Sequence, residues 1–325
     1  MNLKEYDNLT YSDLVLGNKK EGKYVAYNYY GFLKHMKKTT LPKTFRPMLH
    51  YLGEGNILII CSLHDKLVFY NYNTSNNKMN ELVNFSLAEH FHVGGEFIHH
   101  QSFLLNSKYV YLIKNSFPSD DEHIYIYDLN LRRLDSIKND DTRPSSFRIN
   151  YTVNLYDFRL IFFGGMDFSL TPLNHIEAFN LLTYKWEKIE TKGKSPEPRH
   201  SHNSFIVGHN LYILGGTSAK DIFSKHGCFD DFFMLNLNSL TWTPIKMYGT
   251  PPKNLTSNYS FQLSEKYIIF LACEAEEEED NMTQVYRFDS THFEWENIQS
   301  MSSQPEFRFG AGSCLDDVNM VAYIF

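Results

Sequence analysis

Short apolar runs alternate with polar turns along this chain, and no segment keeps a helical period over any length. Residues 198–245 show the pattern most clearly. Four short runs rich in β-branched and aromatic residues are separated there by Gly, Asn and Pro, and the second run ends in Gly215-Gly216. We therefore predict four β-strands that form one small twisted sheet.

Two neighbouring units repeat this pattern in phase. In each unit an Asn or Asp lies six residues before a Trp, and an Ile lies three residues after it. The sets are Asn180, Trp186 and Ile189; Asn236, Trp242 and Ile245; and Asp289, Trp295 and Ile298. A sheet with two apolar faces cannot stand alone, so we expect these units to stack side by side.

The order of an apolar run, Gly-Gly, a loop, an aromatic residue, the Asn or Asp and the Trp resembles the kelch repeat. The match is complete around Gly215, close around Gly164 and degraded in the other units. Kelch repeats build β-propellers with one four-stranded blade per repeat of roughly 50 residues. The resemblance therefore implies an all-β, kelch-type β-propeller.

The two ends of the chain supply complementary half-blades. Tyr24–Met36 resembles the third and fourth strands of a blade, and Ala311–Phe325 resembles the first and second. Pairing of these N- and C-terminal strands would close the ring and remove both exposed edges. We expect six blades, marked by Asn28, Asn73, Asp128, Asn180, Asn236 and Asp289. The alternative is seven blades, if residues 1–21 contain further strands.

We expect a single domain over residues 1–325, with the polar residues 1–21 as a partly ordered arm. The net charge of −7 and the pI of about 6.0 disfavour a nucleic-acid partner. The start has no basic-then-apolar signal region, and no apolar stretch is long enough to span a membrane. A cytoplasmic protein is therefore predicted, with a nuclear location as the alternative. The four cysteines form no C-x-x-C pair, which favours free thiols over a metal site.

Four arginines are the main candidate site residues. Arg46, Arg148, Arg199 and Arg308 each lie about sixteen residues before the end of a second strand, where an innermost strand begins. In the kelch family such positions border the central depression on one face. There a permanently charged, bidentate guanidinium suits acidic or carboxylate groups of a bound peptide. The alternative is that each arginine satisfies backbone carbonyls or an Asp of a neighbouring blade.

A long loop between a second and a third strand supplies two further candidates. Phe223 and Phe229 lie in the segment 220–231, and aromatic side chains dominate interface hot spots. The alternative is that the loop packs on its own blade. His200 and His202 stand at the start of a first strand, where a structural role is favoured over a metal.

We find no phosphate-binding loop and no nucleophile elbow, and we predict neither catalytic residues nor a cofactor nor a metal. The predicted function is a non-catalytic module that binds a peptide or protein segment on its loop face, as an adaptor or scaffold. The propeller is expected to be monomeric and to act within a larger assembly. The alternatives are a propeller-type oxidase or hydrolase with a site in the central channel, and a cytoskeleton-binding protein.

Overall fold

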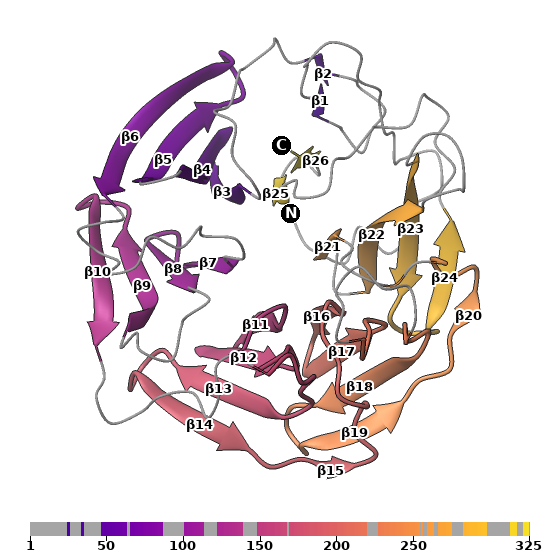
Figure 1. The fold of residues 1–325 in the computed structure, drawn as a ribbon. Helices are drawn as coiled ribbons and strands as arrows, with labels where there is room; N and C mark the ends of the chain where they lie inside the picture. Colours follow the sequence, from indigo (N-terminus) through magenta and orange to yellow (C-terminus); the bar gives the residue numbers. More distant parts are fainter. Residues whose placement is uncertain are drawn as a thin grey trace.

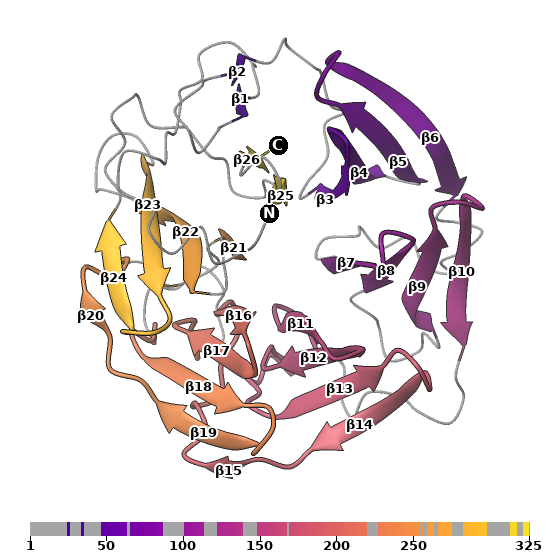
Figure 2. The same ribbon diagram turned by 180° about the vertical axis from the view of Figure 1, so that it is seen from behind.

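The computed structural model has an all-β architecture, and no helix occurs among the residues it describes. It describes residues 25–26, 34–35, 47–63, 66–86, 101–113, 122–138, 148–167, 169–219, 227–253, 255, 259–262, 266–274, 282–297, 313–316 and 321–324. Five sheets stand around a common axis as the blades of a propeller, with the first strand of each blade innermost (Figures 1 and 2).

Four strands of each blade follow one another in chain order from the axis toward the rim. Blade 1 holds β3 (Met48–Gly53), β4 (Asn56–Leu63), β5 (Lys66–Asn73) and β6 (Lys78–Ser86). Blade 2 holds β7 (Gln101–Leu105), β8 (Tyr109–Ile113), β9 (Glu122–Asp128) and β10 (Arg133–Lys138). Blade 3 holds β11 (Thr152–Tyr156), β12 (Arg159–Phe163), β13 (Ile176–Asn180) and β14 (Lys185–Ile189).

Blades 4 and 5 each carry a fifth strand at the rim. Blade 4 holds β16 (Asn203–Val207), β17 (Asn210–Leu214), β18 (Phe232–Asn236) and β19 (Thr241–Pro244), with β15 (Lys192–Gly193) parallel to β19. Blade 5 holds β21 (Tyr259–Gln262), β22 (Tyr267–Glu274), β23 (Met282–Asp289) and β24 (Glu294–Asn297), with β20 (Tyr248–Gly249) parallel to β24. The segment that links two blades therefore runs along the rim before it crosses to the axis.

The predicted Asn and Asp markers close the turn between the third and fourth strands. In each of the five blades the side-chain oxygen accepts hydrogen bonds from the backbone N–H groups two and three residues further on. The acceptors are Asn73, Asp128, Asn180, Asn236 and Asp289. A short polar side chain at this point mimics a turn of the backbone, which explains the recurrence of the marker. The sixth marker, Asn28, lies outside the described residues.

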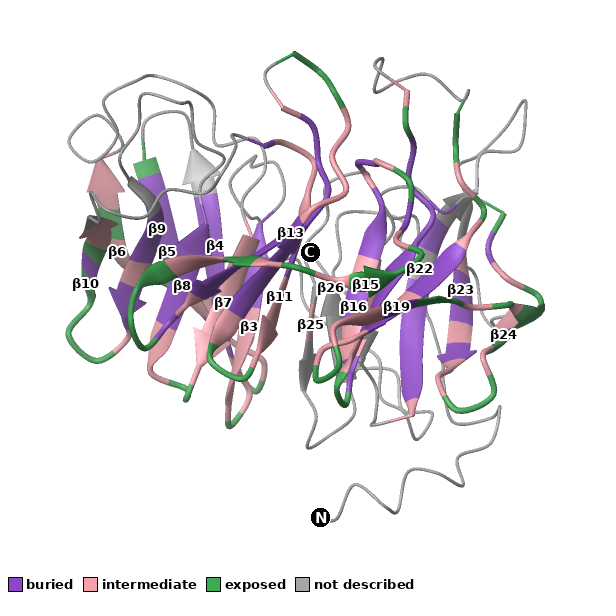
Figure 3. Cartoon of the chain, turned by 90° about the horizontal axis from the view of Figure 1, so that it is seen from below, coloured by how far each residue is buried: buried purple, intermediate pink, exposed green. Residues whose placement is uncertain are grey.

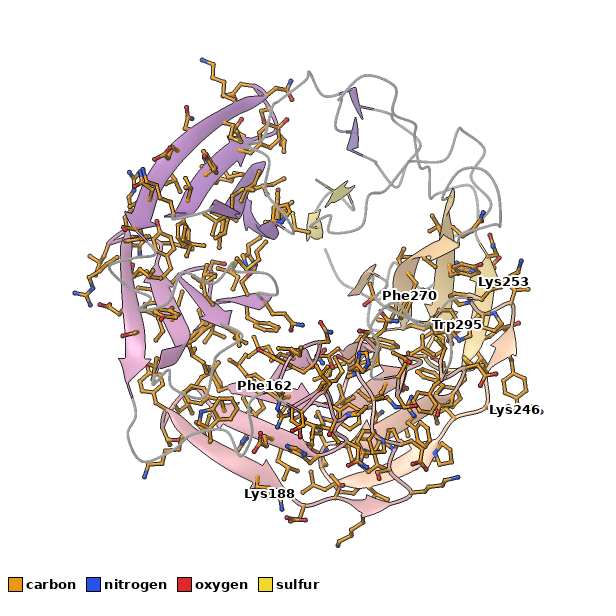
Figure 4. All side chains as sticks on the ribbon, viewed as in Figure 1. Phe162, Lys188, Lys246, Lys253, Phe270 and Trp295 are labelled. Atoms are coloured by element: carbon orange, nitrogen blue, oxygen red, sulfur yellow. The ribbon has the colours of Figure 1, made fainter. Side chains whose placement is uncertain are left out.

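Apolar clusters join neighbouring blades pairwise, so the core is a chain of blade-to-blade contacts. Phe69 of blade 1 stacks on Tyr127 of blade 2 with ring centroids 4.0 Å apart. Phe163 of blade 3 contacts Trp242 of blade 4 at 5.4 Å. Phe270 and Trp295 lie 4.8 Å apart in the cluster that joins blades 4 and 5 (Figure 4). The repeating aromatic positions are thus the packing surface between blades.

The predicted six-bladed ring is not confirmed, because the described residues form five complete blades. The tails contribute two separate two-stranded sheets, β1 (Val25–Ala26) with β2 (Lys34–His35), and β25 (Ser313–Asp316) with β26 (Val321–Ile324). Their strands have the predicted order along the chain, but no strand pairing joins the two sheets. The hydrophobic pattern of a tail predicts strands without fixing which strand they pair with, and this explains the difference. The single-domain boundary and the arm at residues 1–21 stay predictions.

Candidate functional site on the loop face

The two faces of the ring differ in the kind of connection they carry. On the hairpin face, tight turns join first to second and third to fourth strands, and Figure 3 shows these exposed turns along its lower side. On the loop face, longer segments join second to third strands, and the first strands begin. In blades 3 and 4 these longer segments lie between β12 and β13 and between β17 and β18. Of the predicted site residues, Arg148, Arg199 and Phe229 belong to the loop face.

Arg199 is fully buried within blade 4, at the start of the innermost strand. Its guanidinium donates to both carboxylate oxygens of Asp231, at 2.5 and 2.8 Å, and to the carbonyl of Gly215 at 2.8 Å. The aromatic ring of Phe229 lies 4.1 Å from the guanidinium carbon. Asp231 keeps 33% of its side chain exposed. Arg199 therefore holds Asp231, which directly precedes β18, by a partly buried, bidentate ion pair.

Arg148 repeats this arrangement in blade 3. It pairs with the Glu177 carboxylate, donates to His175 Nε2 at 2.7 Å, and reaches the Gly164 carbonyl at 3.5 Å. Both partners of the ion pair are almost completely buried. Burial lowers the pKa of the Arg148 guanidinium, and the charge of Glu177 opposes that shift. Two arginines at equivalent positions thus each hold an acidic side chain of their own blade.

The double glycines join consecutive blades beside these arginines. The Gly165 N–H of blade 3 donates to the carbonyl of Arg199 in blade 4, at 2.9 Å. In the same way, the Gly216 N–H of blade 4 donates to the carbonyl of Leu255, at 3.1 Å. Leu255 thus stands at the next repeat of the Arg199 position. Blade 5 therefore has a leucine where blades 3 and 4 have an arginine.

The histidines near the arginines form hydrogen bonds within the propeller. His200 donates from Nε2 to the carbonyl of Ala219 at 2.7 Å, and His202 Nε2 is hydrogen-bonded to the Thr152 hydroxyl of blade 3 at 2.7 Å. Burial lowers the pKa of His202 to about 3, with further lowering from Arg199 and His200. Both histidines are buried. A neutral imidazole at the boundary between blades 3 and 4 is the form that this packing favours.

The structure places three of the six predicted site residues. Arg148 and Arg199 occupy equivalent positions in neighbouring blades, and their bonds to glycine carbonyls match the structural alternative considered for them. Their acids, however, come from the same blade rather than the next. Phe229 is half-buried and lies against Arg199, as expected for a loop that packs on its own blade. Arg46, Arg308 and Phe223 lie outside the described residues. Ligand contact by any of the six stays a prediction.

Sequence reasoning missed the acidic partners Glu177 and Asp231. They lie 29 and 32 residues after their arginines, so no fixed spacing signals them. The sequence gives only a weak indication of these acids. Each lies close to the start of a third strand that is otherwise apolar. A carboxylate there needs a buried partner, and the arginine sixteen residues before the Gly-Gly pair is the nearest candidate in the repeat pattern.

Two properties of the described residues bear on the other predicted function classes. Among the residues described, no group of three or more His, Cys, Asp or Glu side chains is placed to hold a metal ion. The same part of the chain contains no helix that is long and apolar enough to cross a membrane. The predictions of no metal and no membrane partner stay predictions.

Comparison with known proteins matches this geometry to a repeat family. Residues 100–325 match the model described as the KLHDC2/KLHL20/DRC7 Kelch-repeats domain. The chain is 32% identical over 127 residues to the Rho GTPase-activating protein gacHH of Dictyostelium discoideum. It is 28% identical over 153 residues to acyl-CoA-binding domain-containing protein 5 of Arabidopsis thaliana. It is 29% identical over 107 residues to human Kelch domain-containing protein 3.

These similarities cover only parts of the proteins compared. They span 39%, 47% and 33% of this chain, and 8%, 22% and 27% of the respective relatives. The names of the relatives point to different activities, so the shared region is the repeat domain rather than a common reaction. The blade pattern, the Gly-Gly contacts between blades and the family match over residues 100–325 agree, and the chain belongs to the KLHDC2/KLHL20/DRC7 kelch-repeat family of β-propellers.

Proposed function

We propose that this chain is a non-catalytic protein-interaction module that binds a peptide or protein segment on its loop face. Kelch propellers typically bind proteins and are generally non-catalytic, which supports the class of function. The observation that carries the choice of face is the buried pair of Arg199 and Asp231. It fixes Asp231 at the end of the described segment 227–231, next to Phe229, and a segment ordered in advance loses less entropy on binding.

The arginines act in this proposal chiefly as positioning residues. Because Arg148 and Arg199 are paired with Glu177 and Asp231, their charge is largely balanced, and these two arginines add little net positive charge to the loop face. Phe229 remains half-exposed above Arg199, and Cys228 and Asp230 beside it are exposed. The described segment 227–231 is therefore the proposed contact for the partner. Arg46, Arg308 and Phe223 keep the role proposed for them, contact with acidic or apolar groups of that partner.

A paired capture experiment tests the face. The full chain would be compared with Phe229→Ser on the loop face and Phe158→Ser, an exposed residue of a hairpin turn on the opposite face. Partners recovered by quantitative mass spectrometry should be lost with Phe229→Ser and kept with Phe158→Ser. Equal recovery by all three proteins, or loss with Phe158→Ser alone, would contradict the proposal. Thermal unfolding of the three proteins checks that each variant is folded.

We also propose that the tails complete a sixth blade. β25 lies next to β21 of blade 5 and β3 of blade 1, and β1 lies next to β26. Cys314 of β25 packs against the apolar cluster that contains Leu49 and Ile59 of blade 1. These neighbours are the ones that the innermost and second strands of a closing blade would have. A sixth blade would stand between blades 5 and 1 and close the ring.

The remaining parts of the proposal concern the oligomeric state, the location in the cell and the competing classes of function. A monomeric propeller acting within a larger assembly, a cytoplasmic location and the absence of a nucleic-acid partner stay predictions. A propeller-type enzyme and a cytoskeletal binder are the competing classes. Metal analysis of the purified protein and co-sedimentation with filaments distinguish them, since neither bound metal nor filament binding is expected here.

A further inference from the structure

The outer rim of blades 3 and 4 carries exposed lysines along an open strand edge. β14 and β15 are the outermost strands of their sheets, so each has one hydrogen-bonded neighbour among the residues described. In Figure 1 they follow one another along the rim, and Figure 4 shows Lys188 at this edge. The exposed lysines of the segment are Lys185, Lys188, Lys192 and Lys194. We call residues 185–194 the rim segment.

The two acidic residues of the rim segment already form hydrogen bonds or an ion pair within the propeller. Glu187 accepts hydrogen bonds from Arg159 at 3.2 Å and from Asn180 at 3.1 Å. Glu190 pairs with Lys188 at 3.0 Å. Within the described part of the chain, no ion pair is formed by Lys185, Lys192 or Lys194. Four lysines against two glutamates leave the segment with a charge of +2, on a chain whose net charge is −7.

The rim segment is fixed to blade 4 by contacts around a tryptophan. The Trp242 indole donates to the Thr191 hydroxyl at 3.1 Å, and the Lys192 N–H donates to the Leu240 carbonyl at 2.8 Å. Gly193 has a φ of +80°, and an added Cβ would lie 2.6 Å from the Trp242 carbonyl. Only glycine fits there, so the backbone passes tightly over the blade. Lys192 and Lys194 therefore lie on either side of Gly193, where the backbone is packed against blade 4.

We propose that the rim segment is a docking edge for an extended acidic segment of a partner protein. Such a segment would add its backbone to the open edge of β14 and place its carboxylates against the lysines of the rim. The open edge favours a polypeptide over an anionic membrane or a nucleic acid, because neither of these can continue a β-ladder. This surface lies on the circumference, away from the loop face, so it goes beyond the function proposed above.

The test uses the full chain and a fluorescent peptide of alternating Glu and Val with blocked ends. Anisotropy would measure its affinity for the wild type, for Lys192→Glu with Lys194→Glu, and for Lys66→Glu with Lys78→Glu. The last pair is a matched control, because both lysines are exposed on blade 1. We expect the rim variant to bind about tenfold more weakly and the control to bind like the wild type. Raising the salt from about 0.05 M to about 0.3 M should weaken binding further.

A second peptide separates strand pairing from simple charge attraction. N-methylation of alternate backbone amides keeps every carboxylate but removes the ladder hydrogen bonds, and we expect it to abolish most of the binding to the wild type. This comparison needs no mutation, so it holds even where a variant fails to fold. Equal binding of both peptides, equal binding by rim variant and wild type, or no binding of the Glu–Val peptide would overturn the proposal. Tighter binding of phosphatidylserine vesicles or of poly(U) RNA would overturn it as well.

Discussion

Gly165 and Arg199 join blades 3 and 4 through a backbone hydrogen bond of 2.9 Å, and the same bond joins Gly216 to Leu255 one blade further on. The first glycine of each pair lies where a side chain would collide with the next blade. A Cβ on Gly164 would meet the Arg199 carbonyl at 2.7 Å, and one on Gly215 would meet Leu255 at 2.3 Å. The double glycine is therefore a contact between blades, and its conformation with positive φ lets the chains approach closely.

Substitution of Gly215 by alanine should destabilise the propeller strongly. The new methyl group would collide with Leu255, while the left-handed backbone adds about 1–2 kcal/mol. We expect a loss of about 3 kcal/mol or more in the free energy of unfolding, measured with urea. Gly208→Ala is the matched control, since Gly208 has a φ of +57° but nothing within 4 Å of an added Cβ. Equal losses in the two variants would show that the contact between blades contributes nothing.

Removal of the Asp231 carboxylate should cost about 3–5 kcal/mol, because it leaves the fully buried Arg199 guanidinium without its counter-charge. Asp231→Ala would be compared with Asp230→Ala, a change at the neighbouring exposed acid that should alter stability by less than about 0.5 kcal/mol. Chemical unfolding of both proteins measures the difference. An Asp231→Ala protein as stable as Asp230→Ala would refute the positioning role of the ion pair.

His202 should make the folded state sensitive to acid. Its pKa lies at about 3 in the folded chain, against an ordinary value of 6.5, because burial disfavours the charged ring. Above pH 6.5 both states are neutral at this residue, so it adds no pH dependence. As the pH falls below that value, only the unfolded chain takes up the proton, and stability drops by about 1.4 kcal/mol per pH unit.

The variant His202→Gln removes this contribution, so the slope of stability against pH between about 6 and 4.5 should become shallower by that amount. Unfolding by urea at a series of pH values measures the slope. The variant lacks the hydrogen bond to Thr152 at every pH. The difference in stability between the variant and the wild type at pH 8 measures the loss of that bond alone. An unchanged slope would mean that His202 is accessible to protons in the folded protein.

The cysteines should differ sharply in reactivity. Cys61 is completely buried, and burial raises the pKa of its thiol to about 12, so it should not react with a thiol reagent in the folded protein. Cys228 is exposed beside Phe229 and should react readily. Mass spectrometry after brief labelling, with and without denaturant, measures both sites. Labelling of Cys61 in native buffer at the rate of Cys228 would contradict the packing of blade 1.

Local features of the fold could be predicted from sequence because the residues involved are close in the chain. Asn236 and Trp242 mark a turn and an outer strand within one hairpin, and both act as the pattern indicated. Arg199 and Gly215, which are sixteen residues apart, are also joined by a hydrogen bond from the guanidinium to the glycine carbonyl. Such short separations are set by strand length and turn geometry, which the periodicity of the sequence reports directly.

Contacts between segments that are far apart in the chain could not be predicted from the sequence repeat. Asp231 meets Arg199 across a loop whose length differs from that in blade 3, so the spacing carries no information. In blade 5, Leu255 takes the position that Arg199 has in blade 4, and this equivalence is visible only from the contact that each residue makes with the preceding Gly-Gly pair. The tails are the extreme case: the sequence predicts strands there, but no strand pairing joins the sheet of β1 and β2 to the sheet of β25 and β26.

Closure of the ring by the two tails is the central claim about the architecture, and hydrogen exchange tests it most directly. Exchange of the peptides that cover residues 24–36 would be followed by mass spectrometry in the full chain and after deletion of residues 313–325. We predict slow exchange in the full chain and fast exchange in the truncated one, because β1 would lose β26 as its neighbour. Identical exchange of residues 24–36 in the two proteins would contradict a shared sixth blade.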